Sequence, residues 1–71
     1  RQADLQNTVK ILSKMEAAKA AEIISGMETV EEMIAILSQM SVSDAANILA
    51  AMDAALATDI TRAMMKQQQQ P

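Results

Sequence analysis

Apolar residues recur along the chain with the spacing of short amphipathic helices. In segments 20–27, 30–37 and 42–52 they lie at positions i, i+3, i+4 and i+7. These positions are Ala20, Ile23, Ile24 and Met27, then Val30, Met33, Ile34 and Leu37, then Val42, Ala45, Ala46, Leu49 and Met52. Residues with this spacing share one face of an α-helix. The sequence has no aromatic residue and no strand-type alternation, so the pattern predicts an all-α protein.

The helical pattern is an internal repeat. Methionines at positions 15, 27, 40, 52 and 64 are spaced 12, 13, 12 and 12 residues apart, and the first four end the similar phrases ILSKM, IISGM, ILSQM and ILAAM. Each unit predicts one short helix and a connection. Because such short helices are unstable alone, they must pack on their neighbours. We expect a compact right-handed superhelical stack, a short solenoid of about five helices with 12–13-residue repeats.

Start and stop signals separate the units. "TVEE" at 29–32 is typical of a capping box, "SVSD" at 41–44 is an acidic variant of it, and Asp53 is placed to cap the fifth helix. Gly26 is the only glycine and is expected to end the second helix in a left-handed conformation. Glu16 offers no good cap, so the first two helices could run together. The methionines are expected to pack in the core at helix ends.

The chain divides into three parts by composition. Residues 8–66 contain the short-helix repeats, residues 1–7 are expected to be the end of an upstream helix or coiled coil, and residues 67–71 form a low-complexity, glutamine-rich tail. Apolar residues at the two open ends of such a stack also make self-association plausible.

Composition excludes several classes of function. The chain of 71 residues has no cysteine, no histidine and no aromatic residue, so it lacks thiolate and imidazole chemistry and stacking platforms for bases. No nucleophile–base pair is visible, and we expect neither an enzyme nor a bound cofactor. The net charge of −3 opposes nucleic-acid binding. No apolar stretch approaches the roughly 20 residues of a membrane span, so any membrane contact would come through sequence outside this chain.

Charge is unevenly distributed along the chain. Residues 1–19 carry a net +2, residues 20–61 carry seven acids and no base, and the last ten residues carry +2. The simplest interpretation is a solvated acidic surface around a small core. The sharper one is a face that attracts a basic partner or a divalent cation. For partner contact we single out Glu28, Glu31, Glu32 and Asp44, with exposed Ile or Met side chains between them supplying affinity.

The repeat phrases resemble a known superfamily. "MEAAKAAEIISGM", "MSVSDAANILAAM" and "MDAALATDITRAM" are similar to the short-helix repeats of the MgtE N-terminal-domain superfamily, over roughly residues 9–65. This superfamily includes the cytosolic domain of MgtE-type magnesium transporters and the C-terminal domain of MotE-type flagellar motor-associated proteins. The chain departs from the family pattern in one respect. Where those families often have proline after the capping acid, it has Ala17, Thr29, Val42 and Ala54.

The extent of the repeats favours the MotE-type member. The transporter domain is a longer stack that continues into CBS domains, whereas here the repeats end after the fifth unit. This resemblance implies a non-enzymatic protein-interaction domain that helps to position or stabilise stator and collar components of the flagellar motor. Its partners would be flagellar motor components, and its place would be the periplasmic or extracytoplasmic face of a membrane-anchored protein.

The transporter member is the alternative. It implies a cytoplasmic, Mg²⁺-sensing regulatory domain in which a hard divalent cation screens carboxylates that repel one another. Weak Mg²⁺ candidates under this alternative are Glu28, Glu31, Glu32, Asp53 and Asp59. The sequence has no dense Asp-x-Asp ligand loop, so we expect no strong metal site.

Overall fold

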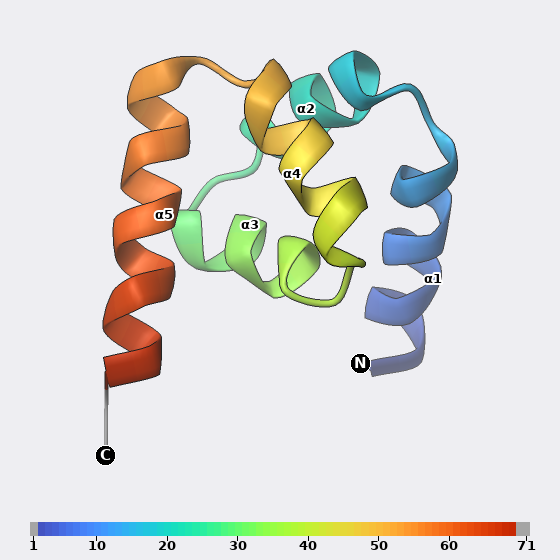
Figure 1. The fold of residues 1–71 in the computed structure, drawn as a ribbon. Helices are drawn as coiled ribbons and strands as arrows, with labels where there is room; N and C mark the ends of the chain where they lie inside the picture. Colours follow the sequence, from blue (N-terminus) through green and yellow to red (C-terminus); the bar gives the residue numbers. More distant parts are fainter. Residues whose placement is uncertain (1, 70–71) are drawn as a thin grey trace.

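The computed structural model describes residues 2–69, with side chains described for residues 4–66. Five helices follow one another: α1 (Gln2–Lys14), α2 (Ala17–Ser25), α3 (Val30–Leu37), α4 (Val42–Ala51) and α5 (Ala54–Gln69). Figure 1 shows them gathered into one stack, and the radius of gyration is 11.5 Å, close to the roughly 11 Å expected for a compact domain of this length. The predicted all-α fold of about five helices is confirmed, and the described residues contain no strand.

The two predicted boundaries within the chain can be compared with the ends of α1 and α5. The predicted boundary at residue 7 falls inside α1. The expectation that residues 1–7 are the end of an upstream helix or coiled coil stays a prediction. The backbone of residues 67–69 belongs to α5, while residues 70–71 of the predicted tail lie outside the described residues. Within residues 2–69, none of the helices is long and apolar enough to cross a membrane.

The start of α3 is built as the sequence predicts. Thr29 has an extended backbone, and its Oγ1 accepts a hydrogen bond from the Glu32 N–H at 3.1 Å. The Glu32 Oε1 atom accepts a hydrogen bond from the Glu28 N–H, also at 3.1 Å. The carboxylate thus reaches one residue before the N-cap, and the two bonds together satisfy donors that a helix start leaves free.

The starts of α4 and α5 use the same device. Ser41 Oγ accepts a hydrogen bond from the Asp44 N–H at 3.1 Å. Asp53 Oδ2 accepts hydrogen bonds from the N–H groups of Ala55 and Leu56, at 3.2 and 3.4 Å. Both predicted caps are therefore confirmed.

The first two helices are separate although α2 has no side-chain cap. Glu16 takes an extended conformation with φ −58° and ψ 140°, and no side-chain hydrogen bond caps the helix start there. Its carbonyl oxygen accepts the first helical hydrogen bond of α2, from the Ala20 N–H at 2.9 Å. The two segments therefore do not run together, and the chain turns at Met15 and Glu16 instead.

The repeated methionine closes each of the first four helices. In every unit its N–H donates to the carbonyl oxygen three residues earlier, which tightens the last turn into a 3₁₀-type turn. These bonds join Met15 to Leu12 (3.2 Å), Met27 to Ile24 (3.0 Å), Met40 to Leu37 (3.2 Å) and Met52 to Leu49 (3.1 Å). All four methionine side chains are buried in the core or packed against it. The prediction that they pack at helix ends is confirmed for these four, whereas the fifth methionine of the series, Met64, lies inside α5.

The predicted left-handed end of α2 is wrong. Gly26 has φ −82° and ψ −1°, which is right-handed helical backbone, and its N–H donates to the Ile23 carbonyl oxygen at 3.1 Å. The 3₁₀-type turn at Met27 already closes the helix, so no positive φ is needed there.

Helices two apart in the chain pack on one another. The main contacts join α1 with α3, α2 with α4 and α3 with α5, and smaller ones join α1 with α2 and α4 with α5. The largest fully buried side chains are Ile24, Leu37 and Ile60, one each from α2, α3 and α5. Ala20 and Ala21 are buried in α2, as expected for small side chains where helix axes approach closely. Burial of this apolar cluster stabilises the short helices.

The apolar spacing wrongly predicts burial for one residue in each of two helices, α2 and α4. Ile23 is 48% exposed and Val42 is 87% exposed, although the spacing predicts both on the buried face. In α2 the buried stripe instead runs through Ala20, Ala21 and Ile24, which leaves Ile23 at its edge. Val42 is the first residue of α4, where the helix start is turned towards solvent.

Candidate functional site

Three of the predicted partner-binding acids lie together at the start of α3. Glu28 is in the connection after α2, and Glu31 and Glu32 are in the first helical turn. All three side chains are exposed. The positive end of the helix dipole favours negative charge at this position, so the fold itself accounts for part of this acidic group.

The three carboxylates have different tasks. The Glu32 carboxylate accepts the Glu28 N–H and is therefore part of the helix cap. Among the hydrogen bonds of residues 4–66, none uses the carboxylates of Glu28 and Glu31. These two side chains are the ones available to meet a cation or a basic partner.

Asp44 lies apart from this group. It is in the first turn of α4, beyond the far end of α3, and an eight-residue helix is about 12 Å long. Its side chain is half-buried and lines a small hollow with Leu12, Ser13 and Asn47, between α1 and α4. The structure therefore does not bring Asp44 together with the start of α3.

The other magnesium candidates are at the start of α5 and within it. Asp53 precedes the helix and spends one carboxylate oxygen on its cap. Asp59 is exposed in the second turn of the helix. Among the described residues, no three acidic side chains are grouped so that they could hold a metal ion. The acids can attract a divalent cation through their summed electrostatic field, or bind it through one or two carboxylates. The described residues form no complete set of protein ligands for such an ion.

The expected apolar anchors are missing from the acidic surface. The residues between the acids, including Met33, Ile34, Ile36 and Met40, are buried in the core rather than exposed. The exposed large apolar side chains are Ile11, Ile23, Val42 and Met65. The expectation that Ile or Met between the acids supplies binding affinity is wrong for the four buried residues, because the helical face that carries them faces inward.

The arrangement defines an all-α helical-repeat domain whose core holds no buried polar side chain among the described residues and whose acids gather at helix starts. Residues 1–71 match the sequence profile of the family described as the MgtE intracellular N domain. The chain belongs to this family, and the superfamily expected from its repeat phrases is confirmed. No curated protein and no solved structure matches the chain.

Proposed function

We propose that this chain is a cytoplasmic regulatory domain of an MgtE-type magnesium transporter, which responds to divalent cations and catalyses no reaction. Membership of the MgtE intracellular N domain family over residues 1–71 carries the proposal. The seven acids and no bases of residues 20–61 support it, because a surface of one sign is sensitive to cations.

The mechanism is electrostatic. Glu28 and Glu31 are exposed near one helix start, and their carboxylates repel each other and the neighbouring Glu32. A Mg²⁺ ion keeps most of its water and needs only one or two carboxylates. Its binding at the start of α3 would lower this repulsion and favour a compact state. Asp53, directly before α5, and Asp59 within it add to the field rather than to the same ligand set.

A regulatory domain must also transmit its cation-dependent change to another part of the protein or to a partner. We propose a protein contact, with Glu28, Glu31 and Glu32 as one contact surface and Asp44 outside it, and self-association as a second route. Nucleic acid does not fit the net charge of −3. Contact with a membrane would come through sequence outside this chain.

The flagellar interpretation has no support beyond the original resemblance. The family description that matches is that of the MgtE intracellular N domain, and no feature of the helices favours a motor-associated member. The transporter alternative is therefore the better-supported interpretation, and with it we propose a cytoplasmic location.

A thermal melt with and without Mg²⁺ tests the proposal. At a concentration equal to its dissociation constant, a single bound ion stabilises by about 0.4 kcal/mol, which corresponds to a rise in Tm of roughly 2–3 °C for a domain of this size. Sodium chloride at equal ionic strength is the control for screening. The proposal expects a larger rise with Mg²⁺, and equal rises with the two salts would contradict cation sensing.

A further inference from the structure

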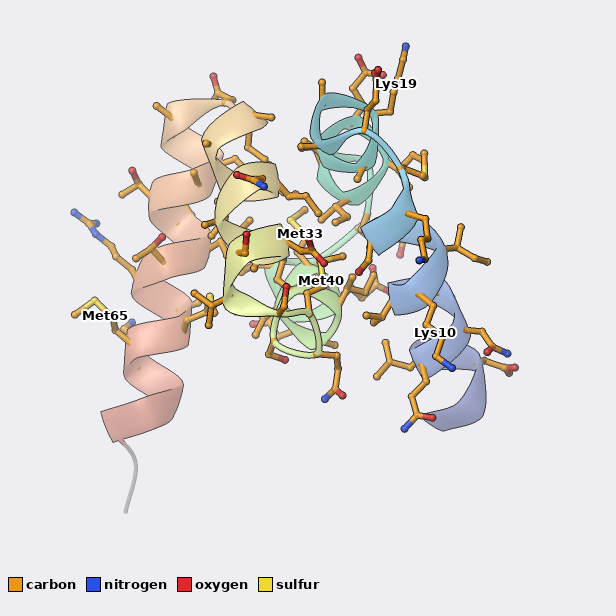
Figure 2. All side chains as sticks on the ribbon, turned by 45° about the vertical axis from the view of Figure 1, so that its right-hand side comes forward. Lys10, Lys19, Met33, Met40 and Met65 are labelled. Carbon is orange, nitrogen blue, oxygen red and sulfur yellow. The ribbon has the colours of Figure 1, made fainter. Side chains whose placement is uncertain are left out.

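A shallow groove lies between α1 and the connection from α3 to α4. Its floor is apolar and is formed by Val9, Ile11 and Met40. Val9 and Met40 are almost completely buried, but Ile11 is 64% exposed. Figure 2 shows the labelled Lys10 on α1 and Met40 beyond the end of α3. The groove continues along α1 to Gln6.

The rim of this groove is basic. Lys10 and Lys14 lie one helical turn apart on α1, on either side of Ile11 in sequence, and both are exposed. On the opposite side Gln39 and Ser41 are polar and uncharged. No carboxylate lines the groove or its continuation. Its charge is therefore opposite to that of residues 20–61, which carry seven acids and no base.

We propose that this α1 groove binds an acidic amphipathic helix of a partner protein. An aliphatic side chain of the partner would cover Ile11 and reach the floor at Met40, while carboxylates one turn apart on the partner would meet Lys10 and Lys14. Helix-in-groove recognition uses this division between apolar anchors and flanking charge. The inference goes beyond the proposed cation response and does not depend on it.

The charge around Ile23 and Met65, two of the three other exposed large apolar residues among the described side chains, argues against their docking from a second copy of the chain. The third, Val42, is two residues from Asp44, and the sedimentation measurement below tests a contact through it. Ile23 has Lys19 one turn before it on α2. Met65 on α5 is adjacent to Lys66, with Arg62 one turn before it. Docking either residue on Ile11 would bring these cations towards Lys10 and Lys14, and like charges across an interface oppose association.

The test uses heteronuclear NMR on the whole chain. The probe is a synthetic helical peptide with leucines on one face and glutamates on the flanking positions, and its counterpart with lysine in place of glutamate is the control. We expect the acidic peptide to shift the backbone signals of Lys10, Ile11 and Lys14 and of the connection at Met40. Shifts centred elsewhere, or equal binding of the lysine peptide, would overturn the proposal.

Charge-reversal variants distinguish binding in the groove from an effect of the net charge of the chain. The double variant Lys10→Glu/Lys14→Glu should bind the acidic peptide about tenfold more weakly, since two attractive surface pairs become repulsive. Lys19→Glu/Lys66→Glu makes the same change in net charge outside the groove and should bind like the wild type. Circular dichroism checks that both variants keep their helicity. Equal weakening in the two variants would show that net charge, not the groove, determines binding, and the proposal would be wrong.

Two further measurements address other occupants. Sedimentation of the chain without peptide should show the same oligomeric state in the wild type and in Lys10→Glu/Lys14→Glu. A dimer that is lost in Lys10→Glu/Lys14→Glu would place a second copy in the groove and overturn the proposal. Vesicles of phosphatidylserine and phosphatidylcholine should not bind the chain. Vesicle binding that requires these two lysines, with no shift from the acidic peptide, would also overturn it.

Discussion

The N–H of Glu32 donates a hydrogen bond to Thr29 Oγ1 at 3.1 Å, and this bond defines the start of α3. The Glu32 carboxylate in turn accepts the Glu28 N–H. The helix start, and not a ligand, therefore accounts for one of the three clustered acids. Asp53 has the same role at α5. The acidic surface is partly a by-product of short helices that need a start, and at the start of α3 this leaves Glu28 and Glu31 as the carboxylates that the cap does not use.

Removal of the cap hydroxyl should destabilise the whole domain. Thr29→Ala leaves the Glu32 N–H without its acceptor, and N-cap replacements of this kind cost about 1 kcal/mol. The free energy of unfolding, measured by urea denaturation, should fall by about this amount. Thr29→Ser keeps the oxygen and should stay close to the wild type. A Thr29→Ala variant as stable as Thr29→Ser would show that the bond contributes nothing.

The cap was readable in the sequence because it depends on local spacing alone. Thr29 and Glu32 are three residues apart, and no tertiary contact is needed to place their hydrogen bond. The repeat of the methionines was readable for the same reason. The rotation of each helix about its own axis cannot be predicted in this way, because it depends on the neighbouring helices. Ile23 and Val42 fit the apolar spacing, but packing of α2 and α4 leaves both exposed.

Two adjacent isoleucines in α2 provide a matched test of that rotation. Ile24 is fully buried and Ile23 is 48% exposed. Ile24→Ala should cost about 2–5 kcal/mol because it leaves a cavity in the core. A domain of this size is stable by only about 3–5 kcal/mol, so the variant should be largely unfolded by circular dichroism. Ile23→Ala should cost below about 1 kcal/mol. Similar losses in both variants would contradict the orientation of α2.

Gly26 gives a second test, because the predicted and the observed backbone conformations imply opposite effects of Gly26→Ala on stability. A left-handed residue at the end of α2, as the sequence suggests, would make Gly26→Ala destabilising. The observed φ of −82° is compatible with alanine, and an added Cβ would meet only the carbonyl oxygens of Ile23 and Glu22, at 3.5 and 3.7 Å. We therefore expect Gly26→Ala to raise the free energy of unfolding by about 0.4–1 kcal/mol. A loss of stability would restore the left-handed interpretation.

The candidate site was only partly predictable. Spacing placed Glu28, Glu31 and Glu32 near one helix start, and the structure keeps them there. Asp44 could not be assigned from sequence, since its separation from them depends on where α3 ends. The α1 groove was missed, although Lys10, Ile11 and Lys14 have the i, i+1, i+4 spacing of one helical surface. Its other side comes from residues 39–41, and only the fold brings these segments together.

An NMR titration with Mg²⁺ determines whether the acids at the start of α3 respond to divalent cations. Sodium chloride at equal ionic strength is the reference, and Glu28→Gln/Glu31→Gln is the variant. We expect saturable shifts that centre on residues 28–31 and disappear in the variant, with Asp44 little affected. Shifts that are spread evenly over the chain, or that sodium reproduces at equal ionic strength, would contradict this expectation.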